Sequence, residues 1–176
     1  LGVIKKTYTT QDSTTIATLF KSMVRPHLEY GNAIWGPFFA GDAISVEAIQ
    51  RRATKLIPEI KQLPYKSRLQ ILKLPSLAYR RKRGDMIHVY KIMNDIVRVN
   101  RDDFFLPTRL SHTRGHHKKI AKGKNIKLVR SNAFSQRVIN DWNSLPESVI
   151  NAESLNSFKG RLDDFWSEMM FDTFDN

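Results

Sequence analysis

Apolar residues recur at spacings of three and four positions in six stretches of the chain, which is the period of an amphipathic α-helix. The stretches span residues 12–27, 42–60, 65–72, 77–97, 134–145 and 155–169. Asp12 or Ser13 can cap the first helix and Ser76 the fourth, because short polar side chains accept from free backbone N–H groups. The pattern therefore predicts a mainly α fold.

Prolines and one irregular segment mark where these helices break. Pro26 is expected to kink or end the first helix, and Pro146 separates the last two. Residues 106–130, LPTRLSHTRGHHKKIAKGKNIKLVR, follow no helical period. We interpret them as a long cationic loop with one or two short β-strands, at residues 119–121 and 126–129.

The net charge of +12 is concentrated in the middle of the chain. Residues 51–130 hold 22 Lys or Arg against five Asp or Glu, a net charge of +17, whereas residues 1–50 are neutral and residues 131–176 carry −5. Such a segment attracts polyanions, because each cation that neutralises a phosphate releases a condensed counterion. A solvated basic surface that serves only solubility is the alternative. An anionic membrane surface fits less well, since the basic residues do not flank one large apolar face.

The composition excludes several classes of protein. With 176 residues and 41% hydrophobic positions, the chain is large enough to bury a core. It has no cysteine, which removes disulfides, thiolate catalysis and Cys-based metal sites. No apolar run approaches the roughly 18 residues of a membrane span, so we expect a soluble, intracellular protein. The chain starts at Leu1, and we expect it to be a piece of a longer protein.

Three histidines in the basic segment raise the question of a metal site. His112 and His116 are four positions apart, and His117 follows directly. However, no cysteine or carboxylate lies among them, and the neighbouring basic side chains would repel a divalent cation. A loop that lies against phosphates or stacks on bases is the better interpretation.

Two pairs of carboxylates and three tryptophans are further candidates for chemistry. Asp102-Asp103 stands in a predicted turn and Asp163-Asp164 on the polar face of the last helix, and neither has a clear third carboxylate partner. The glycine-rich phosphate loop, the serine elbow and the HExxH motif are also missing. No catalytic or metal-binding residue is therefore assigned. Core packing is expected, in preference to base stacking, for Trp35, Trp142 and Trp166.

Six blocks of sequence, read in order, resemble one family. They are LFKSMVRPHLEYGNAIWGP (Leu19–Pro37), IQRRATKLIPEI (Ile49–Ile60), YRRKRGDMIHVYKIMN (Tyr79–Asn94), TRGHHKKI (Thr113–Ile120), FSQRVINDWNSLP (Phe134–Pro146) and NSFKGRLDDFW (Asn156–Trp166). Together they resemble the region that follows the polymerase palm in reverse transcriptases of non-LTR retrotransposons, the LINE elements of the chicken-repeat and jockey type. The resemblance spans nearly the whole chain, and the order of the blocks makes it specific.

The resemblance implies a fragment of an RNA-directed DNA polymerase that carries no polymerase site of its own. The family's catalytic turn, an aromatic residue followed by x-Asp-Asp, has no match in these residues, so the fragment needs no cofactor, although the parent polymerase would need Mg²⁺ and usually carries an endonuclease. The implied domains are a thumb-like helical domain at residues 1–60 and a basic helical C-terminal domain at residues 61–176. The implied location is the cytoplasm and nucleus. The implied partners are RNA, an RNA–DNA hybrid or target DNA, and the missing palm, without a membrane.

Within this resemblance, the candidate contact residues are chosen by their charge and their position in the chain. On the thumb helix, Arg51, Arg52 and Lys55 would follow the template–primer backbone. RNA or target DNA would be held by two further groups: Arg80, Arg81, Lys82 and Arg83, and the loop residues His112, Arg114, His116, His117, Lys118, Lys119, Lys122 and Lys124. Two alternatives stay open: a freestanding or domesticated RNA-binding adaptor without a polymerase, and a metal-dependent nuclease built on the histidine loop and the Asp102-Asp103 pair.

Overall fold

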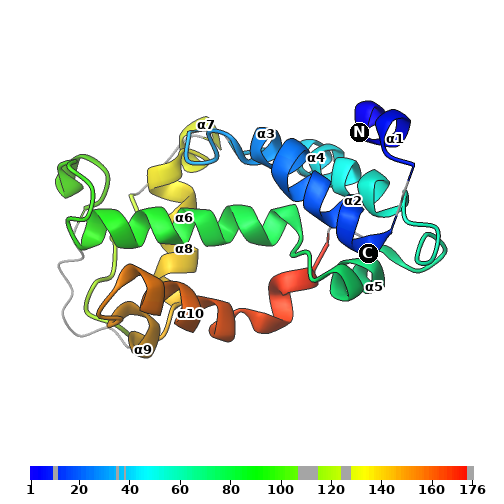
Figure 1. The fold of residues 1–176 in the computed structure, drawn as a ribbon. Coiled ribbons are helices and arrows are strands. Elements are labelled where there is room, and N and C mark those ends of the chain that lie inside the picture. The colour runs from blue at the N-terminus through cyan, green and yellow to red at the C-terminus, as the bar shows by residue number, and fades with distance from the viewer. Residues whose placement is uncertain (10–11, 35, 38, 107–114, 124–127, 174–176) are drawn as a thin grey trace. The chain divides into compact units, whose positions relative to one another are not determined.

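The computed structural model describes residues 1–9, 12–34, 36–37, 39–106, 115–123 and 128–173 (Figure 1). These residues form two compact units. Unit 1 comprises Leu1–Gly31, Pro37–Arg81 and Glu168–Asn176, and unit 2 comprises Asn32–Gly36 and Lys82–Ser167. The division after Arg81 falls within the long helix α6 (Leu77–Met93). Residue 60, where the sequence suggested a domain boundary, lies inside unit 1.

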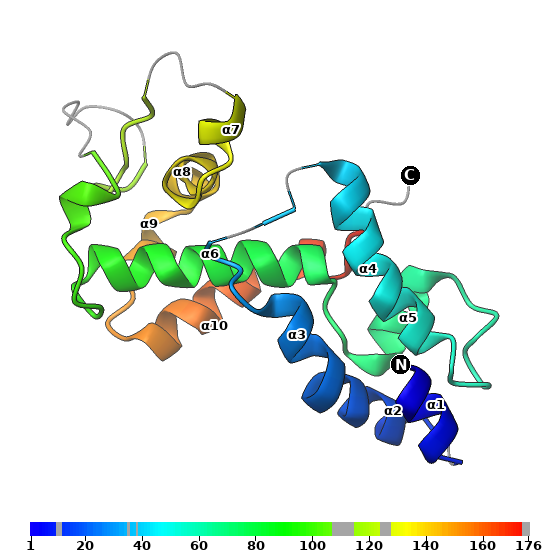
Figure 2. The ribbon, with the colours of Figure 1, turned by 90° about the horizontal axis from the view of Figure 1, so that it is seen from above.

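The described residues are mainly helical, which confirms the expected fold class. Unit 1 contains α1 (Gly2–Thr7), α2 (Ser13–Leu19), the π-helical segment η1 (Phe20–Val24), α3 (Arg25–Glu29), α4 (Ala40–Thr54), α5 (Tyr65–Leu72) and the first turns of α6. Figure 2 shows α4 lying beside α5 within this unit. Its core is an apolar cluster drawn from α1, α2, α5 and the turns that follow α4 and α5, with Ile57 and Leu69 fully buried.

Pro26 does not end the first helical run, and the local geometry explains why. The Asp12 carboxylate caps α2 by accepting from the backbone N–H groups of Thr14 and Thr15, and these bonds lower its pKa. The run then widens into η1, and Pro26 sits in the first turn of α3. The widened turn bonds the Arg25 N–H to the Phe20 carbonyl oxygen, five residues back, so the backbone there accommodates a residue that has no N–H. The helical path therefore continues to Glu29.

The second helix ends earlier than its apolar pattern suggested. Apolar positions recur to Ile60, but α4 ends at Thr54. Pro58 explains the difference, because it has no N–H to donate to the Thr54 carbonyl and disfavours helical geometry at Ile57. Ile57 and Ile60 still enter the core, but from turns. The apolar pattern therefore predicted correctly that Ile57 and Ile60 are buried, but it was wrong to place them in a helix.

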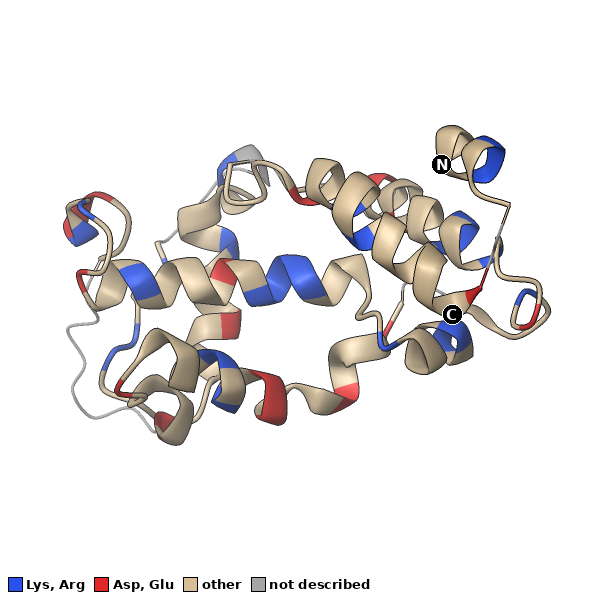
Figure 3. Cartoon of the chain, in the orientation of Figure 1, with Lys and Arg blue, Asp and Glu red and all other residues tan. Residues whose placement is uncertain are grey.

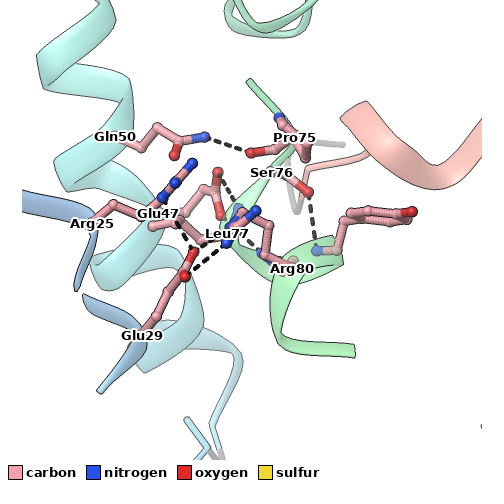
Figure 4. A network of polar contacts seen from close by, with 10 residues as sticks. Arg25, Glu29, Glu47, Gln50, Pro75, Ser76, Leu77 and Arg80 are labelled. Atoms are coloured by element: carbon pink, nitrogen blue, oxygen red, sulfur yellow. Dashed lines mark hydrogen bonds and ion pairs between the residues drawn. The ribbon is translucent and has the colours of Figure 1, made fainter. Parts of the chain in front are cut away.

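Both ends of α5 and the start of α6 match the prediction, whereas α6 ends at Met93, before the predicted residue 97. Helix α5 occupies the predicted residues 65–72, and Lys73 caps it in the left-handed conformation at φ 48°. The hydroxyl of Ser76 accepts from the N–H of Tyr79 at 3.2 Å, as expected for the N-cap of α6. The carboxylate of Glu47, which is buried, adds a second cap by accepting from the N–H groups of Leu77 and Ala78 (Figure 4).

Unit 2 contains the later part of α6, η2 (Arg101–Asp103), α7 (Leu128–Ser131), α8 (Phe134–Ser144), α9 (Glu147–Ile150) and α10 (Leu155–Phe165). Both predicted C-terminal helices are confirmed by α8 and α10. The rings of Tyr90 and Phe158 stack at 4.2 Å between centroids, and the hydroxyl of Tyr90 donates to the carbonyl oxygen of Ala152 at 2.6 Å. Trp142 and Trp166 are buried as expected, whereas Trp35 lies outside the described residues.

The predicted strands differ most from the structure. At residues 119–121 the only extended pairing is a single bridge residue, Ile120. Leu128 and Val129, expected in the second strand, instead lie in α7, so that prediction is wrong for these two residues. A short apolar run does not distinguish a strand from a helical turn, which is the physical source of the error.

Candidate nucleic-acid interface

The three basic residues of the predicted thumb helix lie at the C-terminal end of α4. Arg52 and Lys55 are exposed, and Lys55 is the C-cap of the helix. The guanidinium of Arg51 instead lies 4.8 Å from the centre of the Tyr65 ring. Cations at this position also complement the negative end of the helix dipole. The structure therefore leaves Arg52 and Lys55 as the residues of this group with the most solvent exposure.

Arg80 is engaged in a structural ion pair within unit 1. Its guanidinium forms two hydrogen bonds with the carboxylate of Glu29, one of them from Nη2 at 2.9 Å (Figure 4). Arg25 approaches the same carboxylate, with Nε 4.0 Å from Oε1. The Arg80–Glu29 pair is about three-quarters buried on each side. A nucleic acid would have to compete with Glu29 for this arginine.

The basic positions along α6, visible in Figure 3, continue into unit 2 with similar partners. Arg83 forms a two-bond pair with Asp163, including Nη2 to Oδ2 at 2.8 Å. Lys82 approaches Asp141 at 3.5 Å and stays exposed. Arg81 is half-buried. Some of the basic side chains of α6 therefore form ion pairs with acidic residues of the same unit.

The described part of the basic loop, residues 115–123, begins with a residue that belongs to the core. His116 is only 2% exposed, and its Nε2 donates to the carbonyl oxygen of Trp142 at 3.0 Å. Burial lowers the pKa of this imidazole below its ordinary value of 6.5. His116 is thus a neutral packing residue and has no surface to offer a ligand. His112, Arg114 and Lys124 lie outside the described residues.

Helix α8 fixes the backbone of the loop after His116. The indole Nε1 of Trp142 donates to the carbonyl oxygen of Lys118 at 2.8 Å. The side chain of Asn143 bonds Ile120 twice, accepting from its N–H at 2.9 Å and donating to its carbonyl oxygen at 2.8 Å. On the other side, the N–H of Ala121 donates to Leu106 O at 2.9 Å. We call residues 116–121 the anchored strip, because each end is tied to α8 or to Leu106.

The anchored strip borders a pocket of about 310 Å³ in unit 2. Four basic side chains line it, namely those of Arg101, His117, Lys118 and Lys119. The remaining lining is apolar and comes from Met93, Phe105, Leu106 and Ile120. The strip therefore places cations next to an apolar surface, which is the combination a base with its phosphate requires.

Lys118 is held in place by a neutral partner. Its Nζ donates to Oδ1 of Asn94 at 2.6 Å, and the Nδ2 of Asn94 donates in turn to the carbonyl oxygen of Tyr90 in α6. An amide positions the ammonium without cancelling its charge. Lys119 folds back towards Gly115, whose φ of 111° favours glycine and where a Cβ atom would lie 2.9 Å from Lys119 Cε.

Two carboxylates lie near the pocket and weaken its positive potential. His117 Nδ1 lies 3.6 Å from Glu147, and Arg101 Nε lies 3.9 Å from Asp102. The side chains of both pairs are at least 49% exposed, so solvent screens each interaction strongly. Lys122, the next basic residue of the loop, is exposed.

The acidic pairs do not form a metal site in the part of the chain that the structure describes. Asp103 accepts from the Asn100 side chain in η2, and Asp163 is engaged by Arg83. Among the described residues, no group of three or more His, Cys, Asp or Glu is placed to hold a metal ion.

Sequence reasoning missed two residues of this site, Arg101 and Asn94. Arg101 lines the pocket and lies beside the Asp102-Asp103 pair, so in the sequence it looks like the partner of an adjacent carboxylate. Asn94 follows the last residue of α6, where a polar side chain near free carbonyls is a signal of a helix C-terminus. A polar residue at this place predicts that Asn94 caps α6, but it does not predict that Asn94 also positions Lys118.

Comparisons with known proteins identify no relative. No family model matches the chain, and neither a curated protein nor a solved structure is significantly similar to it. Within the described residues, no helix combines the length and the apolar character needed to cross a bilayer.

Proposed function

We propose that this chain is a nucleic-acid-binding region of a retrotransposon reverse transcriptase, corresponding to the thumb and the C-terminal region that follow the palm. It would grip template–primer or element RNA through backbone phosphates. The sequence blocks that resemble this family motivate the proposal. The net charge of +17 over residues 51–130 provides the physical force.

The anchored strip is the observation that carries the proposal. Within the basic loop, the described strip at residues 116–121 is tied to α8 through the side chains of His116, Trp142 and Asn143. Holding cations in fixed positions costs conformational entropy and brings like charges together. A partner with regularly spaced negative charges offsets that cost, and nucleic acid is such a partner.

The end of α4 supplies a second contact surface, which belongs to unit 1. Arg52 and Lys55 are exposed on a helix whose opposite side holds the buried Ala43, Glu47 and Gln50. A packed face and a cationic face allow a helix to hold a duplex by its phosphates without reading its sequence.

The double variant Arg52→Gln/Lys55→Gln tests this second surface. Each lost phosphate contact should lower the slope of log affinity against log salt by about one, so the variant should lose about two and bind more weakly to all sequences alike. The matched control is Lys5→Gln/Lys6→Gln, which removes the same charge from exposed positions of α1 in the same unit. Equal effects of the two double variants would mean that only net charge matters, and the proposed surface would be discarded.

A further inference from the structure

We infer that the pocket beside the anchored strip holds one unstacked nucleotide of a single-stranded nucleic acid. The inference rests on the proposed nucleic-acid function and makes it more specific, since it assigns a base-accepting subsite to unit 2. A volume of about 310 Å³ is at the small end of ligand pockets, which suits one nucleotide and excludes a base pair within a stacked duplex.

The apolar lining explains why a base would enter the pocket. Leu106 is 63% exposed, although its side chain is as apolar as that of the buried Ile120 beside it. Exposed leucines are common, but this one borders a cavity whose other apolar walls are Phe105 and Met93. Phe105 is itself buried, so the apolar surface that a base would remove from water is that of Leu106 and the partly exposed Met93.

The cationic lining explains where the phosphate would lie. Lys118 Nζ is fixed by Asn94 at 2.6 Å, and Arg101 is the lining residue that can form two parallel bonds with phosphate oxygens. The phosphate would therefore meet a lysine ammonium and an arginine guanidinium at the edge of an apolar cavity.

The hydrogen bonds around the strip keep the pocket open before a ligand arrives. The Asn143 side chain holds Ile120 through two hydrogen bonds, and the N–H of Ala121 donates to the carbonyl oxygen of Leu106. The backbone segments that carry Ile120 and Leu106 are therefore hydrogen-bonded to each other. A preformed pocket binds with less ordering cost than one that must assemble.

The decisive comparison is between adenosine 5′-monophosphate and ribose 5-phosphate, each titrated into the intact chain and followed by NMR at the methyl groups of Ile120 and Leu106. Both ligands carry the same phosphate, and only the first carries a base. We expect the nucleotide to bind at least about fivefold more tightly, because its base covers apolar surface that ribose 5-phosphate leaves in water. Equal affinities, or no binding of the nucleotide in the millimolar range, would overturn the inference.

Single substitutions test the apolar lining and the cationic lining of the pocket separately. Leu106→Ser should reduce the preference for the nucleotide over ribose 5-phosphate, whereas the matched change Leu63→Ser, at an exposed leucine of unit 1, should not. Arg101→Gln should weaken both ligands by a similar factor, and its control is Arg98→Gln, an exposed arginine that does not line the pocket. If the control and pocket variants behave alike, the ligand binds elsewhere.

Asn94→Ala tests whether Lys118 is positioned or merely present. This change removes no charge, yet it should weaken both ligands, because the ammonium loses its fixed partner. Binding that is unchanged in Asn94→Ala would show that Lys118 has no positioned role. The inference can fail while the proposed function stands: a chain that binds hybrid duplex with a steep salt dependence but shows no preference for the nucleotide has no base subsite.

Discussion

Trp142 and Lys118 are joined by a hydrogen bond of 2.8 Å from the indole Nε1 to the lysine carbonyl oxygen. Trp142 is completely buried, so the anchored strip is attached to the core of unit 2 through a side chain that cannot move away. The same residue accepts from His116 Nε2 through its own carbonyl oxygen. The position of the basic residues is thus set by core packing in unit 2.

Replacing Trp142 with phenylalanine should loosen the strip. The change removes the donor to Lys118 and leaves a small void, and we expect a loss of roughly 1–3 kcal/mol in the free energy of unfolding. Denaturant unfolding measures the loss, and hydrogen exchange at residues 118–121 should increase. An exchange pattern identical to that of the wild type would contradict the anchoring role.

The stability of unit 2 should fall as the pH drops below about 6.5. Burial lowers the pKa of His116 in the folded state, so the unfolded chain binds a proton more readily. The stabilisation is therefore complete above the ordinary value of 6.5 and is lost as the pH falls towards the lowered value. Within the described residues Nδ1 has no hydrogen-bond partner, so a proton there would be buried unsatisfied.

Thermal unfolding between about pH 7.5 and 5 tests this prediction. In His116→Gln, which keeps a donor for the Trp142 carbonyl oxygen, the loss of stability at low pH should be smaller. The control His27→Gln changes an exposed histidine of unit 1 and should keep the wild-type profile. A wild-type profile in His116→Gln would assign the pH dependence to other groups.

Arg80 should matter more for stability than for binding. Its pair with Glu29 is mostly buried, so Arg80→Gln leaves that carboxylate with only the more distant Arg25 and should cost about 1–2 kcal/mol of unfolding free energy. Arg52→Gln, at an exposed position, should stay within about 0.5 kcal/mol of the wild type. The reverse order in denaturant unfolding would mean that the ion pair with Glu29 does not stabilise unit 1.

Lys73→Gly should stabilise unit 1. Lys73 holds a left-handed conformation at φ 48°, which costs an ordinary residue about 1 kcal/mol and a glycine almost nothing. Its N–H caps α5 by donating to Gln70 and Leu69, and glycine keeps that N–H. A rise in the melting temperature is expected, and a fall would show that the lysine side chain makes a stabilising contact.

The sequence correctly predicted the residue range of α5 and the Ser76 cap at the start of α6. It gave the wrong end for α4, because Pro58 ends that helix before the apolar pattern ends. Pro26, expected to kink or end the first helix, does not end it, and the π-helical segment η1 stands directly before α3. Both outcomes depend on the backbone hydrogen bond that a proline cannot donate, and hydrophobic periodicity carries no information about backbone hydrogen bonds.

For the site, the sequence located the basic segment but not the roles within it. In the sequence, nothing separates Arg80, Arg83 and His116 from the other basic candidates. In the structure each has a partner far away in the chain, namely Glu29, Asp163 and Trp142 respectively. Only tertiary contacts separate such structural residues from the cations that line the pocket. Asn94 was missed for the same reason, because its partner is 24 positions away.

The central claim is that the basic segment binds nucleic acid, and salt dependence tests it most directly. The purified chain would be titrated against an RNA–DNA hybrid between about 50 and 200 mM salt, with heparin as the competing polyanion. The account predicts that affinity falls by about a thousandfold or more over this range, as for six or more phosphate contacts, and that the hybrid is preferred over heparin. Weak binding with a flat slope would contradict it and leave the +17 segment as a solvated surface.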